Sequence, residues 1–212
     1  MSESNHDTGG VKAETSSWSR FWSRLTAEPE PSIAHRLYDR LVRHARFPIY
    51  YGRLGVPDTP EGRFEVLALH VGLAVRKLSS QGDEGRKAGQ ALFDLMVADL
   101  DMNLRELGVG DLSVGKQVKR LAQQFYARLA VLSDAFDDDR HDVLSPMLQT
   151  NVVASSPSAS EQAAALADIV VALSEALDRH DPVELMAGKV ILPDEPALTA
   201  IVDRKRLNGA EQ

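Results

Sequence analysis

Cysteine is absent from the 212 residues of this sequence. Its absence excludes disulfide bonds, thiolate metal sites, iron–sulfur clusters and covalent haem attachment. Long apolar runs are absent as well. The longest run, from Val66 to Val75, is interrupted by His70 and Gly72 and is far shorter than the roughly 20 apolar residues that a membrane-spanning helix requires. Neither a disulfide-stabilised scaffold nor a transmembrane helix is therefore expected.

The alternation of apolar and polar residues that marks β-strands is also almost absent, and β-branched residues are sparse, so a sheet is not expected. The hydrophobic fraction of 43% and the charged fraction of 26% are ordinary for a globular protein. A formal net charge of -7 argues against a general coating of nucleic acid, although it permits a local basic patch. We predict an all-α fold, an irregular helical bundle with a disordered N-terminal arm.

The chain divides into three predicted parts. Residues 1–32 are rich in Ser, Glu and Thr and are expected to form a flexible arm. Residues 33–153 are expected to form a helical core, and residues 154–212 a C-terminal helical extension and tail. The polar, acidic start at residues 1–7 shows neither a secretory signal nor a transit peptide. We therefore expect the bacterial cytoplasm as the compartment, with peripheral contact at the inner membrane.

One segment of the arm has helical spacing of large apolar residues, namely Trp18, Phe21, Trp22 and Leu25. Arg20 and Arg24 lie between them, and an aromatic stripe flanked by cations is typical of a helix that contacts a membrane surface or a partner's groove. A short helix that folds back onto the domain is an equal alternative. We predict membrane contact by this stripe. Flotation with anionic liposomes tests it: deletion of residues 1–30 should abolish flotation, and equal flotation of both proteins would contradict it.

The helical periodicities place the expected helices at about 32–47, 60–78, 86–107, 113–133, 143–153 and 161–179, with a weak helix or two between 182 and 202. Pro48 is expected to end the first helix, and a turn-rich loop is expected from Tyr50 to Thr59. Thr59 or Asp58 is the expected N-cap of the second helix. The hydrophilic segment 79–85 is expected to be a loop.

The helix expected after residue 113, with Ser113 as its cap, separates apolar from basic residues. Its apolar stripe is formed by Val118, Leu121, Ala122, Phe125, Leu129 and Leu132, and its polar face by Lys116, Lys119, Arg120, Gln123 and Arg128. No acidic residue occurs from 112 to 133. Most such faces are simply solvated. The same cations could bind an anionic partner, so a nucleic-acid-binding regulator that uses the basic helix near 116–128 is the alternative function.

Evidence for an enzyme is weak. Asp94 and Asp101 share one helical face and could hold a divalent metal or act as acid and base, but no further residues complete such a site. An ion pair between Asp101 and Arg105, which are i and i+4 neighbours, is the better interpretation. His70, inside an apolar helix, is expected to be a hydrogen-bonded core residue. We therefore predict no enzymatic activity, no catalytic residues, no metal and no cofactor.

Several blocks of the sequence look familiar: ARFP at 45–48, Tyr50–Tyr51, GVPDTPEGRF at 55–64, Leu92–Asp94, Asp99–Asp101 and LRELGVGD at 104–111. Together they resemble the ubiquinol–cytochrome c chaperone family over about residues 33–132. The blocks at 55–64 and 104–111 are the most specific. The sequence departs from the family pattern at Ala127, where a glycine is expected, and at Val131, where an aromatic residue is expected.

The resemblance implies an all-helical, non-enzymatic assembly factor for ubiquinol–cytochrome c reductase. Mitochondrial members bind newly made cytochrome b and act with a small partner protein near the ribosomal tunnel exit. For this chain we expect cytochrome b or another respiratory subunit as the client. A small partner protein and the ribosome are further candidates, and no specific DNA is expected.

We predict that the client lies in a groove beside two glycine-containing corners, 55–64 and 108–116. The predicted client- and partner-binding residues are Arg46, Tyr50, Asp58, Arg63, Arg105, Glu106, Asp111, Lys116, Lys119 and Arg120. Their charges also suit a purely structural role, in which arginine–aspartate pairs fix the corners, and the residue types alone favour that role for most of them. Asp111 is also a candidate to cap the helix that follows it.

Overall fold

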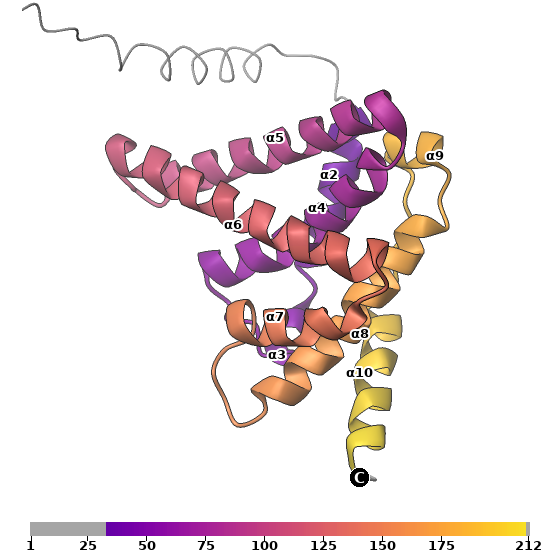
Figure 1. Ribbon diagram of the computed structural model, residues 1–212. Coiled ribbons are helices and arrows are strands. Elements are labelled where there is room, and N and C mark those ends of the chain that lie inside the picture. Colours follow the sequence, from indigo (N-terminus) through magenta and orange to yellow (C-terminus); the bar gives the residue numbers. More distant parts are fainter. Residues whose placement is uncertain (1–32, 211–212) are drawn as a thin grey trace, which may run out of the picture. The chain divides into compact units, whose positions relative to one another are not determined.

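The computed structural model of this chain describes residues 33–210. Within that range the regular elements are α-helices and one short 3-10 helix (Figure 1), which confirms the predicted all-α bundle. In chain order they are α2 (Ile33–Ala45), α3 (Pro48–Gly52), α4 (Pro60–Ser79), α5 (Gly82–Glu106), α6 (Asp111–Asp137), η1 (His141–Val143), α7 (Leu144–Asn151), α8 (Ala159–Asp178), α9 (Pro182–Met186) and α10 (Glu195–Ala210). No helix of this part of the chain is long and apolar enough to cross a bilayer.

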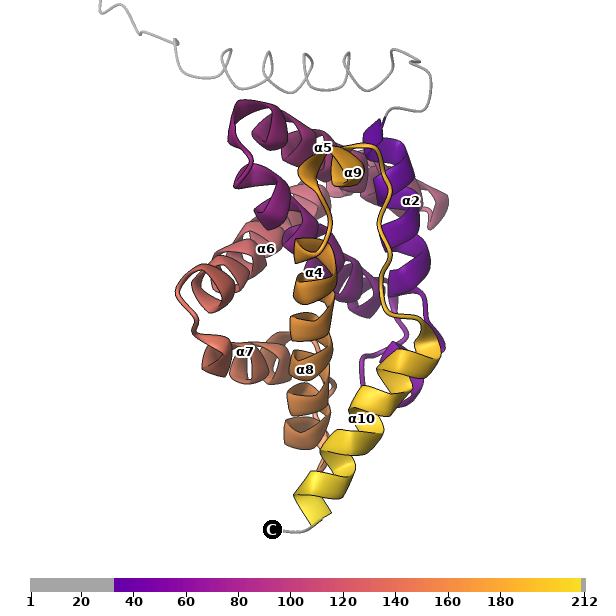
Figure 2. The ribbon, with the colours of Figure 1, turned by 90° about the vertical axis from the view of Figure 1, so that its right-hand side faces the viewer.

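Helix α4 is the centre of the bundle. It begins as predicted, with Pro60 at the first helical position and the Thr59 hydroxyl accepting a hydrogen bond from the Gly62 amide at 3.2 Å. Apolar residues on nearly all of its faces are buried, from Phe64 to Leu78. It packs against α2, α5, α6 and α8; Figure 2 shows α4 behind α8. A helix that is apolar all round requires such neighbours.

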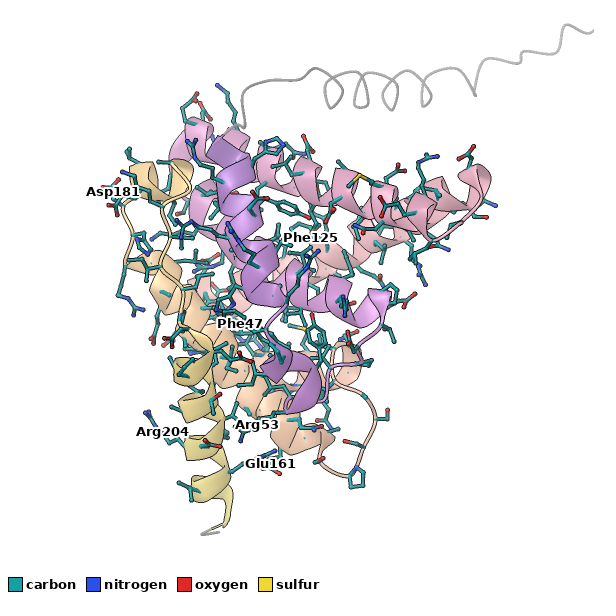
Figure 3. The ribbon with its side chains drawn as sticks, turned by 180° about the vertical axis from the view of Figure 1, so that it is seen from behind. Phe47, Arg53, Phe125, Glu161, Asp181 and Arg204 are labelled. Carbon is teal, nitrogen blue, oxygen red and sulfur yellow. The ribbon has the colours of Figure 1, made fainter. Side chains whose placement is uncertain are left out.

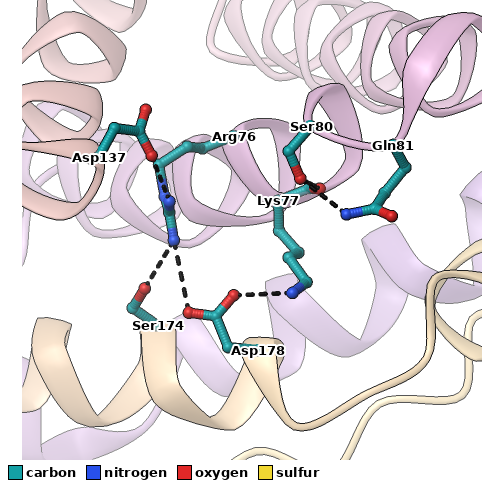
Figure 4. Close-up of polar contacts among 7 residues, drawn as sticks. All are labelled: Arg76, Lys77, Ser80, Gln81, Asp137, Ser174 and Asp178. Atoms are coloured by element: carbon teal, nitrogen blue, oxygen red, sulfur yellow. Dashed lines mark hydrogen bonds and ion pairs between the residues drawn. The ribbon is translucent and has the colours of Figure 1, made fainter.

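Arg76 and Lys77, at the C-terminal end of α4, join it to α6 and α8 (Figure 4). The Arg76 guanidinium donates to Asp137 of α6 at 2.7 Å and to the Ser174 hydroxyl of α8 at 3.0 Å. Asp178 of α8 accepts from Lys77 at 2.9 Å and lies 3.6 Å from Arg76. These bonds tie one end of the central helix to two neighbours.

Two predicted loops are longer than the observed ones, because a helix covers part of each: α3 includes the first three residues of the loop predicted from Tyr50 to Thr59, and residues 53–59 are non-helical as predicted. Pro48 does not only end α2: it opens the short helix α3, because its fixed φ suits a first helical position. The predicted loop at 79–85 is reduced to two residues, and α5 already starts at Gly82. Asp83 and Glu84 fall in its first turn, where acidic side chains interact favourably with the helix dipole.

Helices α5 and α6 form a long hairpin that turns at residues 107–110. Gly108, with φ +79°, sits just beyond the end of α5 as the predicted helix-ending glycine. The cap of α6 differs from the prediction. Its N-cap is Gly110, and Ser113 lies inside the first turn, where its amide donates to the Gly110 carbonyl at 2.8 Å. Ser113 is therefore not the cap.

The C-terminal elements pack back onto the first helices. Helix α8 contacts α4, α7 and α10, and α9 contacts α2. Arg53, which follows α3, pairs with Asp203 of α10 at 2.5 Å. Figure 3 shows Arg53 and, on α10, the neighbouring residue Arg204. Between α9 and α10 the chain passes along α2, where the Val190 carbonyl accepts from Arg40 at 3.3 Å. The predicted division at residue 153 stays a prediction.

Two glycines in helices should respond oppositely to alanine. A Cβ at Gly62 would lie 2.0 Å from the Pro57 carbonyl oxygen, whereas a Cβ at Gly115 would meet nothing within 4 Å. Gly62→Ala should therefore lower the free energy of unfolding by about 1–3 kcal/mol, and Gly115→Ala should raise it by about 0.5–1 kcal/mol. Urea denaturation followed by circular dichroism measures both. A Gly62→Ala protein as stable as the wild type would refute the close approach.

Candidate binding groove

A cavity of about 510 Å³ opens between the ends of four helices: the C-terminal ends of α2 and α5 and the N-terminal ends of α4 and α6. We call it the groove. Its walls are mainly apolar and include Val42, Tyr51, Phe64, Leu67, Leu104 and Leu121. Its charged lining residues include Arg46, Glu61, Arg63, Glu106 and Arg120, all of them exposed. The groove thus combines an apolar floor with a charged rim.

The hairpin of α5 and α6 leaves the groove open. Its turn lies away from α8 and α10 (Figure 1), so the last turns of α5 have few neighbours. Leu107, which follows α5 and lines the groove, is 63% exposed, and Met102 in the last turns of α5 is 55% exposed. Leu107 therefore presents an exposed apolar side chain at the edge of the groove.

A smaller cavity of about 230 Å³ adjoins the groove on the side of α7. It shares Glu61, Phe64, Arg120 and Leu121 with the groove and adds Asn151 and Val152 among its further lining residues. The first turns of α4 and the first half of α6 therefore line both hollows.

Four of the predicted binding residues line the groove: Arg46, Arg63, Glu106 and Arg120. Asp58 lies beside them, because its carboxylate accepts a hydrogen bond from Arg63 Nε at 2.6 Å. That hydrogen bond holds the pKa of Asp58 below and the pKa of Arg63 above their ordinary values. The Arg63 guanidinium also lies 5.8 Å from the centre of the Tyr51 ring. The structure thus brings five of the ten predicted residues together at one rim.

Arg105 and Asp111 brace the hairpin. Arg105 Nε donates to Asp101 at 2.6 Å, which confirms the predicted ion pair, and Arg105 Nη1 donates to Asp111 at 2.5 Å across the turn. These carboxylates raise the pKa of Arg105, with the Asp101 hydrogen bond as the largest cause. The predicted capping role of Asp111 is wrong: no side chain caps α6, and the Asp111 carboxylate is bound by Arg105.

The remaining predicted residues lie elsewhere. Tyr50 is only 1% exposed, and the structure places it in the core instead of on a binding surface. Lys116 and Lys119 are exposed on α6 but line neither hollow. The predicted membrane-contacting residues Trp18, Phe21, Trp22 and Leu25 lie outside the described residues, so their role stays a prediction.

Arg128 does not belong to the exposed basic face of α6, which corrects the prediction. It is 8% exposed and donates two hydrogen bonds to the carboxylate of Glu65 on α4, at 2.9 and 3.0 Å. A buried arginine requires such a partner, and the two-pronged geometry is the strongest that the pair can form. The charge of Arg128 is therefore paired with Glu65 inside the bundle and is not part of the exposed basic face.

The two aspartates considered for chemistry are engaged in hydrogen bonds. Asp101 is bound by Arg105, and Asp94 accepts from the Gln90 side chain at 2.7 Å. Across residues 33–210, no cluster of three or more histidine, cysteine, aspartate or glutamate side chains is arranged to hold a metal ion. His70 is buried and hydrogen-bonded, as predicted.

The fold is an all-helical bundle with an open, mainly apolar groove. Residues 52–192 match the family model described as Ubiquinol-cytochrome C chaperone, so the chain belongs to that family. The resemblance inferred from the sequence blocks is thereby confirmed.

Relatives with known names agree with this assignment. The chain is 23% identical over 117 residues to the "Ubiquinol-cytochrome c reductase complex assembly factor 1" of Mus musculus and of Homo sapiens. The match covers 55% of this chain and 40% and 39% of theirs, so the chain spans about two fifths of these relatives. The crystal structure of the Cbp3 homolog from Brucella abortus superposes with a TM-score of 0.66 at 29% identity, covering 90% of this chain and 97% of that one.

Proposed function

We propose that this chain is a non-enzymatic chaperone for the cytochrome b subunit of ubiquinol–cytochrome c reductase, and that the groove binds the unassembled subunit. Membership of the ubiquinol–cytochrome C chaperone family supports the respiratory complex as the destination. The two mammalian relatives carry the name of an assembly factor for the same complex. The family and the relatives' names do not identify the client. That the client is cytochrome b, and that it binds in the groove, are our proposals.

The observation that carries the proposal is the exposed apolar surface of the groove. Leu107 stands open at its edge, and Phe64 and Leu104 line its wall. A membrane subunit that awaits assembly exposes apolar helices, and an apolar helix face fits a groove between helices. The rim of the groove carries both basic side chains, Arg46 and Arg120, and acidic ones, Glu61 and Glu106. These charges can pair with the polar ends of such a segment.

A nucleic-acid-binding role has less support than the sequence alone suggested. Arg128 is used in a buried ion pair, and Arg120 lines the groove. Lys116 and Lys119 remain as exposed cations of the proposed face. We therefore do not propose nucleic acid as a partner.

The proposal predicts a specific loss in cells. Deletion of the gene should reduce the spectroscopic cytochrome b signal of ubiquinol–cytochrome c reductase several-fold, because the unprotected subunit is degraded before assembly. The cytochrome b transcript and the activity of succinate dehydrogenase, a different respiratory complex, should not change. A plasmid copy should restore the signal. Unchanged cytochrome b content and reductase activity in the deletion strain would reject the proposal.

A further inference from the structure

Three polar side chains meet in the core, beside the groove but not in it. They are His44 of α2, Tyr50 of α3 and His70 of α4, which are 5%, 1% and 2% exposed. His44 Nδ1 lies 2.8 Å from His70 Nε2, and the Tyr50 hydroxyl oxygen lies 3.3 Å from each of these two nitrogens. The cluster therefore joins three helices at one point.

The outer nitrogens of the two rings have fixed roles. His44 Nε2 lies 2.7 Å from the Pro193 carbonyl oxygen, and His70 Nδ1 lies 2.8 Å from the Val66 carbonyl oxygen. Carbonyl oxygens only accept hydrogen bonds, so each outer nitrogen must carry a hydrogen. In a neutral imidazole, that is the ring's single N–H hydrogen.

The inner nitrogens are then one proton short. If both rings are neutral, two bare lone pairs face each other at 2.8 Å, which is a hydrogen-bond distance. Tyr50 has one hydroxyl hydrogen, and from 3.3 Å it cannot fill the space between the two nitrogens. Three short ring contacts require three ring protons, whereas two neutral rings carry two.

We propose that His44 and His70 form a buried binding site for a single proton, held between His44 Nδ1 and His70 Nε2, that fastens α2, α3, α4 and the segment before α10 together. The pair binds one proton and excludes a second. This inference is independent of the proposed client.

A proton suits the site better than a metal ion. Two imidazole nitrogens bound to one tetrahedral zinc ion at 2.0–2.1 Å lie roughly 3.3 Å apart. The observed separation of 2.8 Å is shorter. The short outer contacts of 2.7 and 2.8 Å also match charge-assisted hydrogen bonds from a cationic pair.

The surroundings explain why only one proton fits. Among the residues that the structure describes, no carboxylate forms a hydrogen bond with either ring. Tyr50 faces the rings from α3, the centre of the Phe47 ring lies 4.6 Å from that of His44, and Glu195 of α10 accepts from the Ile49 amide at 3.2 Å instead. Burial lowers the pKa of His44. Burial, together with the charge of His44, lowers the pKa of His70 to about 3.

The pair should therefore weaken the fold in acid. In the unfolded chain both histidines take up a proton near their ordinary pKa of 6.5, whereas the folded pair holds at most one. Below pH 6.5 the unfolded state therefore binds more protons than the folded state, and the difference grows to at least one proton well below that pH. Folding becomes less favourable as the pH falls, by up to about tenfold in the equilibrium constant per pH unit for each extra proton.

Long-range ¹H–¹⁵N NMR of the full chain, labelled at histidine and titrated from pH 7.5 to 4.5, tests the site. The two rings together should take up one proton, with one common midpoint and a coupling between the inner nitrogens across the shared hydrogen. Tyr50→Phe should keep this behaviour, and His70→Gln should abolish the coupling. If His70→Gln does not fold, the wild-type titration still decides. Two separate protonation steps, no uptake above pH 4.5, or displacement of the proton by added Zn²⁺ would overturn the proposal.

Discussion

Replacing Arg128 with alanine is expected to lower the free energy of unfolding by about 3–5 kcal/mol. The substitution leaves the Glu65 carboxylate buried without the two hydrogen bonds that it now receives. A buried charge that loses its only strong partner is among the most destabilising changes in a protein core. The loss should appear as a large shift in the urea midpoint.

Two further variants separate the buried ion pair from the general effect of removing an arginine. Arg120→Ala removes an exposed arginine from the same helix and should change the stability by less than about 0.5 kcal/mol. The double variant Glu65→Met, Arg128→Met replaces both charges with apolar side chains and should recover much of the lost stability. If Arg128→Ala were as stable as Arg120→Ala, the buried ion pair would not exist in solution.

Replacing Leu107 with aspartate is expected to impair cytochrome b assembly while leaving the fold intact. Leu107 is 63% exposed, so the substitution costs the folded chain little. In the groove, however, it places a charge against the apolar surface that we propose for the client, and the affinity should fall about tenfold or more. The measurement is the cytochrome b content of a deletion strain that carries the variant gene.

The chain offers a matched control for this variant. Leu207 on α10 is 69% exposed and does not line the groove. Leu207→Asp should therefore support normal cytochrome b content, and both variants should unfold at the same urea concentration as the wild type. Equal cytochrome b content in the two strains would contradict a role of the groove.

The helices and several of their ends could be predicted because local spacing determines them. The Thr59 cap and Gly108 are local signals, and the structure confirms both. The helix starts at Pro48 and Gly82 were harder to predict from the sequence. Residues that form turns, such as Pro and Asp, also favour the first turn of a helix.

The Arg128 error has a different origin. The charge of Arg128 predicts an exposed residue, but Arg128 lies at helical spacing from Leu121, Phe125 and Leu132, which are buried. Its position therefore indicated burial, and only its residue type indicated exposure. Glu65, its partner, lies 63 positions away in the sequence. No local pattern could identify that partner.

The groove and the histidine pair depended on tertiary structure in the same way. The sequence blocks predict several charged residues of the rim. The exposure of Leu107, however, depends on how the α5–α6 hairpin projects from the bundle, and the sequence of one helix does not determine that. His44 is i+3 to Leu41 and i+7 to Leu37, so its burial could have been predicted. Its contact with His70 could not, because α2 and α4 have to pack before the two rings meet.

Site-specific photo-crosslinking in cells tests the central claim, that the groove receives unassembled cytochrome b. A photoreactive amino acid is placed at position 107 in one strain and at position 207 in another, and the products are identified by mass spectrometry. We expect a cytochrome b adduct from position 107 and none from position 207. The absence of cytochrome b from the adducts at position 107, or equal yields at both positions, would contradict the claim.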